Sequence, residues 1–189
     1  MVFGVVTSLH AIPITGTISI GTAGGGADWT GNGNVNTITT IISFGDAEVT
    51  SRTGSFATGG VANGAVVTMG QPLDFVAPFI SIVNPLWSVN APGGVFSFTL
   101  APPIGITRIS GGGLIPDTLR LDGMGTISGP AIDGFDVTTG GWTWSGQLNG
   151  TSTFTFSSTT LPGVPDGGTT VALLGAALSG LALLRRRLA

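Results

Sequence analysis

The chain has 189 residues, with 33 glycines, no cysteine and a formal net charge of −3. Its length suffices for one domain with a hydrophobic core, and the lack of cysteine excludes a disulfide framework and thiolate metal sites. Three of the six basic residues are the arginines at 185–187, so the rest of the chain is acidic. Such a surface repels phosphate backbones, and we therefore expect no nucleic-acid partner.

Residues 1–11 read MVFGVVTSLHA and look like the last part of a signal peptide. Apolar residues at 2–6 precede the small residue Ala11, after which we predict cleavage. No basic residue comes before the apolar stretch, which is short, so we hypothesise that the true start lies upstream. The alternative is that residues 2–6 form an ordinary first strand. The single histidine, His10, falls in this segment, and we assign it no catalytic role.

Residues 12–160 alternate apolar and hydroxyl side chains, which is typical of half-buried strands. Glycine-rich turns separate these runs, and Asn149-Gly150 predicts a hairpin. The pattern predicts an all-β domain, an antiparallel, jelly-roll-like β-sandwich of roughly 10–13 strands. We expect its core to contain Phe44, Phe56, Phe75, Phe79, Phe96, Phe98, Phe135, Trp142, Trp144, Phe154 and Phe156.

Asp28, Trp29 and Trp87 are candidate ligand-binding residues, because tryptophan rings can stack on sugars. Packing of these rings in the core or at its rim is an equal alternative. Oxygen donors of the kind that Ca²⁺ takes recur in the same glycine-rich region, but ordinary Asx turns explain them as well. These donors are Asp28, Asn32, Asn34 and Asn36.

Two carboxylate pairs could in principle hydrolyse glycosides, Asp46 with Glu48 and Asp133 with Asp136. We prefer a solvated edge pair as the explanation of the first. We predict that the protein is not an enzyme, that it has no catalytic residue, and that it needs no metal or cofactor.

The C-terminal segment combines three features. Val164-Pro165-Asp166-Gly167-Gly168 precedes an uncharged apolar run, and Arg185, Arg186 and Arg187 follow it. Apolar residues cover all sides of a helix over 169–184, which predicts a single transmembrane span with a cytoplasmic basic tail at 185–189. The alternative is a helix that docks on a soluble domain, which would carry only one apolar face.

This order of motif, apolar helix and basic cluster resembles the VPDSG-CTERM variant of the PEP-CTERM sorting signals. Gly167 stands where the name of the variant has serine. The resemblance implies export in a Gram-negative bacterium and tethering to the inner membrane. It also implies that an exosortase-type sorting enzyme recognises the motif at 164–168, which lies in a linker and motif segment at 161–168. The mature protein would then reach the cell surface or extracellular matrix.

The segments 119–127, 134–138 and 142–146 also resemble the closing strands of small exported PEP-CTERM proteins, which have no defined activity. We therefore predict an exported surface or matrix protein with a structural or adhesive role. The alternative function is an extracellular carbohydrate-binding module, with polysaccharide as the partner.

Overall fold

The computed structural model describes residues 12–24, 27–30, 34–76, 84–112, 117–147 and 152–158. Strands dominate these residues, and the helices are single turns. The elements are β1 (Ile12–Pro13), β2 (Thr17–Gly24), β3 (Asp28–Trp29), η1 (Val35–Thr37), β4 (Thr40–Ser43), β5 (Asp46–Arg52), α1 (Ser55–Thr58), β6 (Val66–Met69), β7 (Leu73–Asp74), β8 (Trp87–Ala91), β9 (Gly94–Ile109), β10 (Thr118–Ser128), η2 (Ala131–Asp133), β11 (Phe135–Asp136), β12 (Thr138–Gln147) and β13 (Ser152–Ser158).

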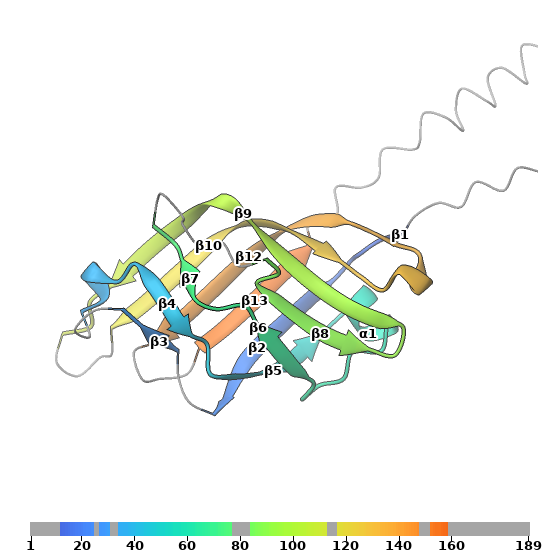
Figure 1. Cartoon of the computed structure of the whole chain (residues 1–189), viewed down its shortest axis with the longest axis horizontal. Helices are drawn as coiled ribbons and strands as arrows, with labels where there is room; N and C mark the ends of the chain where they lie inside the picture. The colour runs from blue at the N-terminus through green and yellow to red at the C-terminus, as the bar shows by residue number, and fades with distance from the viewer. Residues whose placement is uncertain are drawn as a thin grey trace, which may run out of the picture. The chain divides into compact units, whose positions relative to one another are not determined.

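Eight antiparallel strands form one closed barrel in the order β10-β12-β13-β2-β5-β6-β8-β9 (Figure 1). The predicted all-β, antiparallel architecture is confirmed. The predicted sandwich differs from the structure, because a single sheet closes on itself instead of two sheets packing face to face. Register shifts within the β9–β10 and β2–β5 pairs bend these strands, and such bulges allow a twisted sheet to curl into a barrel.

The alternation seen in the sequence directs the apolar side chains into the barrel. Along β12, Gly140, Trp142, Trp144 and Gly146 are buried, whereas the residues between them are partly exposed. The ring of Phe98 on β9 contacts Trp142 across the intervening strand β10, with ring centroids 6.5 Å apart. Of the predicted core, the structure buries Phe44, Phe56, Phe75, Phe96, Phe98, Trp142 and Trp144.

The other predicted core residues divide into two groups. Phe135 is half-buried and packs against the core. Phe79 lies outside the described residues, and the side chains of Phe154 and Phe156 are not described.

The predicted hairpin is present, since β12 pairs with β13 and Trp144 lies opposite Phe154. The connection itself, with Asn149 and Gly150, lies outside the described residues.

One end of the barrel is closed by segments 12–14 and 130–138, which we call the end cap. Here β1 pairs in parallel with β11, and Ile14 N donates to Thr138 Oγ1 at 2.8 Å. The Phe135 ring covers Phe96, with their centroids 5.7 Å apart. Figure 1 shows β1 and α1 at this end, with β3 and β4 at the opposite end of the barrel.

The opposite end carries a small sheet in the order β3-β4-β7. Arg108 of β9 holds the adjacent turn, because its Nη2 donates to Ile38 O at 2.8 Å. The same guanidinium lies 5.9 Å from the centroid of the Phe75 ring. The excursion of the chain between β2 and β5 is thereby fixed to the long β9–β10 hairpin.

Several predicted features lie outside the described residues. They are the signal-peptide remnant at 1–11 with its cleavage site Ala11, the linker and sorting motif at 161–168, the transmembrane helix at 169–184 and the basic tail at 185–189. Within the part of the chain that the structure describes, no helix has the length and apolar character needed to cross a membrane.

Candidate functional site

The predicted ligand-binding residues do not form an exposed platform. Asp28 is exposed, but the next residue, Trp29, is only 5% exposed, and Trp87 is fully buried. Trp29 packs edge-on against Trp144, and Trp87 stacks on Phe98. A sugar stacks on the open face of an aromatic ring, and these two rings have no open face. The core-packing alternative describes both tryptophans.

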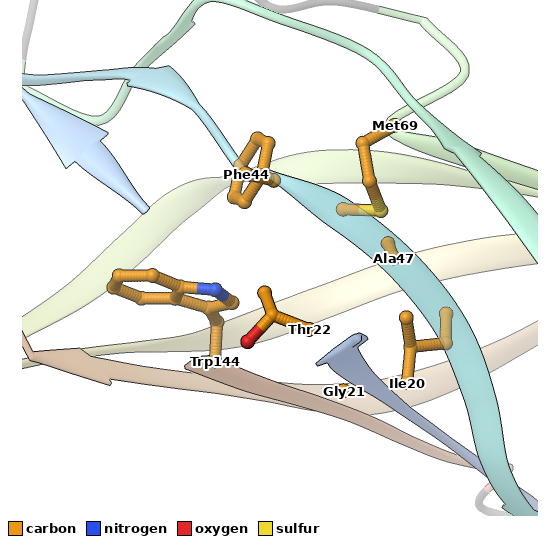
Figure 2. A pocket seen from close by; sticks show the side chains of 7 residues that line it. All are labelled: Ile20, Gly21, Thr22, Phe44, Ala47, Met69 and Trp144. Carbon is orange, nitrogen blue, oxygen red and sulfur yellow. The ribbon is translucent and has the colours of Figure 1, made fainter. Parts of the chain in front are cut away.

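A small hollow lies between the rings of Trp144 and Phe44 and the strands β2, β5 and β6. It has a volume of about 10 Å³. Figure 2 shows the side chains around it, among them Trp144, Phe44 and Met69. A space of this size accommodates about one water molecule, whereas an organic ligand needs a pocket of some hundreds of Å³. The hollow is therefore a packing feature at the end of the core.

The candidate carboxylates lie on the outside of the barrel and its end cap. Asp46 is exposed at the start of β5, and Glu48 is half-buried two residues later. Asp133 and Asp136 are both exposed and flank Gly134 and Phe135. Among the described residues, no three His, Cys, Asp or Glu side chains come close enough together to hold a metal ion.

One of the oxygen donors considered for Ca²⁺, Asn34, serves a local turn. Asn34 caps η1, and its Oδ1 accepts a hydrogen bond from Asn36 N at 2.9 Å. This is the Asx turn that the sequence offered as the alternative. Asn32 lies outside the described residues.

The side chain of Asp117 connects two parts of the fold, a role that the sequence did not predict. Its carboxylate accepts hydrogen bonds from Gly111 N at 2.9 Å and from Val35 N at 3.4 Å. The Gly111 N–H is the main cause that lowers the pKa of Asp117, and partial desolvation opposes it. Asp117 therefore fastens η1 to the β9–β10 hairpin. An aspartate at the end of a glycine-rich turn was the only signal in the sequence.

The functional signal lies beyond the barrel. A family model described as the VPDSG-CTERM motif matches residues 163–188. Residues 163–188 are a VPDSG-CTERM motif. The match contains Val164-Pro165-Asp166-Gly167-Gly168 and the arginines at 185–187. It covers 26 of the 189 residues, so it characterises the C-terminal segment and leaves the barrel unassigned.

The VPDSG-CTERM motif is a C-terminal sorting signal of the PEP-CTERM type. It marks an exported protein that is anchored to a membrane before an exosortase-type enzyme processes it. The predicted sorting signal and the predicted class of processing enzyme are therefore supported. No curated protein and no solved structure matches the chain.

Proposed function

We propose that this protein is a non-enzymatic surface or matrix component whose C-terminal segment is a temporary membrane tether. In this proposal residues 169–184 span the inner membrane of a Gram-negative bacterium, with the arginines at 185–187 on the cytoplasmic side. The sorting enzyme cuts the tether at or near residues 164–168. The released barrel then has a structural or adhesive role at the cell surface or in the extracellular matrix.

The VPDSG-CTERM motif at 163–188 carries this proposal. The position of the last barrel strand supports it, because β13 ends at Ser158, before the matched segment begins. A cut within 164–168 leaves every strand of the barrel in place. The domain is therefore able to keep its fold after it loses the segment that carries the signal.

The barrel has no catalytic role in this proposal. The candidate carboxylates project from strands and turns without a described cleft between them, and the hollow accommodates about one water. The carbohydrate-binding alternative required open faces on Trp29 and Trp87, and the burial of both rings speaks against it.

A variant of the motif tests the proposal. Replacing Asp166 by Ala should leave the full-length chain in the membrane fraction, because the enzyme no longer recognises its signal. Asp28→Ala is the matched control, since it also removes a carboxylate, but this carboxylate is exposed on β3 and far from the motif in the sequence. The control should be processed and released like the wild type. Equal release of both variants would contradict a role of the motif in sorting.

A further inference from the structure

The end cap exposes three large apolar side chains. Ile12 is 53% exposed, Ile132 is 82% exposed and Val137 is 64% exposed. All three come from segments that hydrogen bonds hold side by side, since Ile12 N donates to Gly134 O at 3.0 Å and β1 pairs with β11. Exposed apolar residues that gather on one small element are typical of an interaction surface.

The end cap is a built structure and not a frayed end. Pro130 is buried, and the Phe135 ring covers Phe96. Ile14 is fully buried and is fixed by its hydrogen bond to Thr138. The backbone that presents Ile132 and Val137 is therefore anchored on both sides to the core of the barrel.

The charged residues of the end cap are all acidic. Asp133 and Asp136 are exposed, and neither segment of the end cap, 12–14 or 130–138, contains a basic residue. An apolar surface flanked by carboxylates is complementary to an apolar protein surface with basic residues around it. It is a poor match for anionic lipid headgroups, which attract basic segments.

The strand that leads to the sorting signal ends beside the end cap. Ser158, the last residue of β13, lies opposite Gly140, and Ser157 lies opposite Thr17. Gly140 is two residues from Thr138, the last residue of the end cap, whose Oγ1 accepts a hydrogen bond from Ile14 N. Only residues 159–162 separate Ser158 from the matched segment, and five extended steps of chain reach about 18 Å at most. An enzyme that engages the motif is therefore kept within a short radius of this end of the barrel.

We infer that the end cap is a second contact surface for the enzyme that processes the VPDSG-CTERM motif. The inference rests on the proposed function, because it needs the sorting enzyme as the partner. In it, Ile132 and Val137 pack on an apolar surface of the enzyme, and Asp133 and Asp136 face basic residues around that surface. Because the short linker raises the effective concentration of one contact once the other has formed, even a weak contact speeds recognition of the signal.

The rate at which the tail is lost in native cells tests this inference. In a pulse-chase experiment, full-length Ile132→Ser/Val137→Ser should be processed about fivefold more slowly than the wild type. The matched control is Ile42→Ser/Ile109→Ser, which removes two isoleucines that are 49% and 52% exposed on β4 and β9, away from the end cap. The control should be processed at the wild-type rate. Thermal unfolding of each full-length variant in detergent should show equal midpoints, because all four side chains are exposed.

A charge-reversal variant distinguishes a contact of the end cap with the enzyme from a contact with a lipid surface. Asp133→Lys/Asp136→Lys should also be processed more slowly than the wild type if basic groups of the enzyme face the end cap. Processing that is unchanged or faster in this variant contradicts the inference, and faster processing identifies an anionic membrane surface as the occupant. If the wild type itself keeps its tail, the proposed function fails. If the wild type loses its tail and the Ile132/Val137 variant loses it equally fast, the inference alone fails.

Discussion

The ring of Phe98 occupies the space that a side chain at Gly125 would need. Phe98 is fully buried on β9, and Gly125 lies on the neighbouring strand β10. A Cβ atom at Gly125 would overlap the ring and would lie 2.6 Å from Thr99 O. Gly125 therefore lets one of the largest core side chains lie flat against the barrel wall.

Gly125→Ala should lower the free energy of unfolding by about 1–3 kcal/mol, the usual result of overpacking a core. Gly141→Ala on the next strand, β12, is the matched control, because its Cβ would meet its nearest neighbour at 3.9 Å. Urea unfolding of the full chain in detergent measures both values. A Gly125→Ala variant as stable as Gly141→Ala would show that Phe98 does not pack as described.

Arg108 should stabilise the junction between η1 and the long hairpin. Arg108→Met removes the hydrogen bond to Ile38 O and the contact with the Phe75 ring, which together should cost about 1–2 kcal/mol. Arg120→Met is the control, because Arg120 is 54% exposed and is 4.0 Å from Asp122. That change should cost less than about 0.5 kcal/mol. Amide hydrogen exchange at residues 35–41 should speed up in the Arg108 variant alone.

Protonation of the Asp117 carboxylate should lower the stability of the barrel in acid. Its pKa in the folded chain lies below the ordinary value of 3.8, chiefly because Gly111 N–H bonds to the carboxylate. The unfolded state therefore binds the proton more readily, so this stabilisation is complete above pH of about 4 and disappears as the pH falls through the folded pKa.

Unfolding measured between pH 5 and pH 2 checks this assignment. Asp117→Asn should be less stable than the wild type at pH 5, and the difference should narrow as the wild type is protonated. Asp28→Asn, which changes an exposed carboxylate on β3, is the control and should be as stable as the wild type at pH 5. A constant difference between Asp117→Asn and the wild type at every pH would contradict a role for the charge.

The fluorescence of the four tryptophans should show that their rings are shielded from solvent in the folded chain. Trp29, Trp87, Trp142 and Trp144 are each at most 5% exposed. Iodide should therefore quench the fluorescence of the folded chain weakly and that of the urea-unfolded chain strongly. Added polysaccharide should leave the emission unchanged. A shift in emission on titration with a sugar would revive the carbohydrate-binding alternative.

The strand pattern could be predicted from the sequence because it depends on local alternation. Phe96 and Phe98 alternate with hydroxyl residues, and both point into the barrel. The same alternation fits a sandwich or a barrel, since both structures have one apolar face per strand. The choice depends on pairing between distant strands, such as β13 with β2, where Phe154 lies opposite Ile20. It also depends on the bulge at Gly123/Met124, where Trp142 Nε1 donates to Met124 O at 3.1 Å. Neither feature leaves a local signal in the sequence.

The candidate site was less predictable. The burial of Trp29 depends on Trp144, which is more than 100 residues away in the chain, and Asp117 binds Val35 across a separation of 82 residues. Composition around a residue does not report such contacts. The sorting signal was predictable for the opposite reason, because its motif, apolar run and arginines are contiguous.

The central claim is that the C-terminal segment is a sorting signal that is removed. The most direct test is the intact mass of the mature protein, purified from the membrane, surface and medium fractions of native cells. We expect the protein outside the cell to lack everything beyond the motif at 164–168 and to retain β13. A full-length chain that ends in its arginine-rich tail and remains in the membrane fraction would contradict it and would identify a permanent anchor.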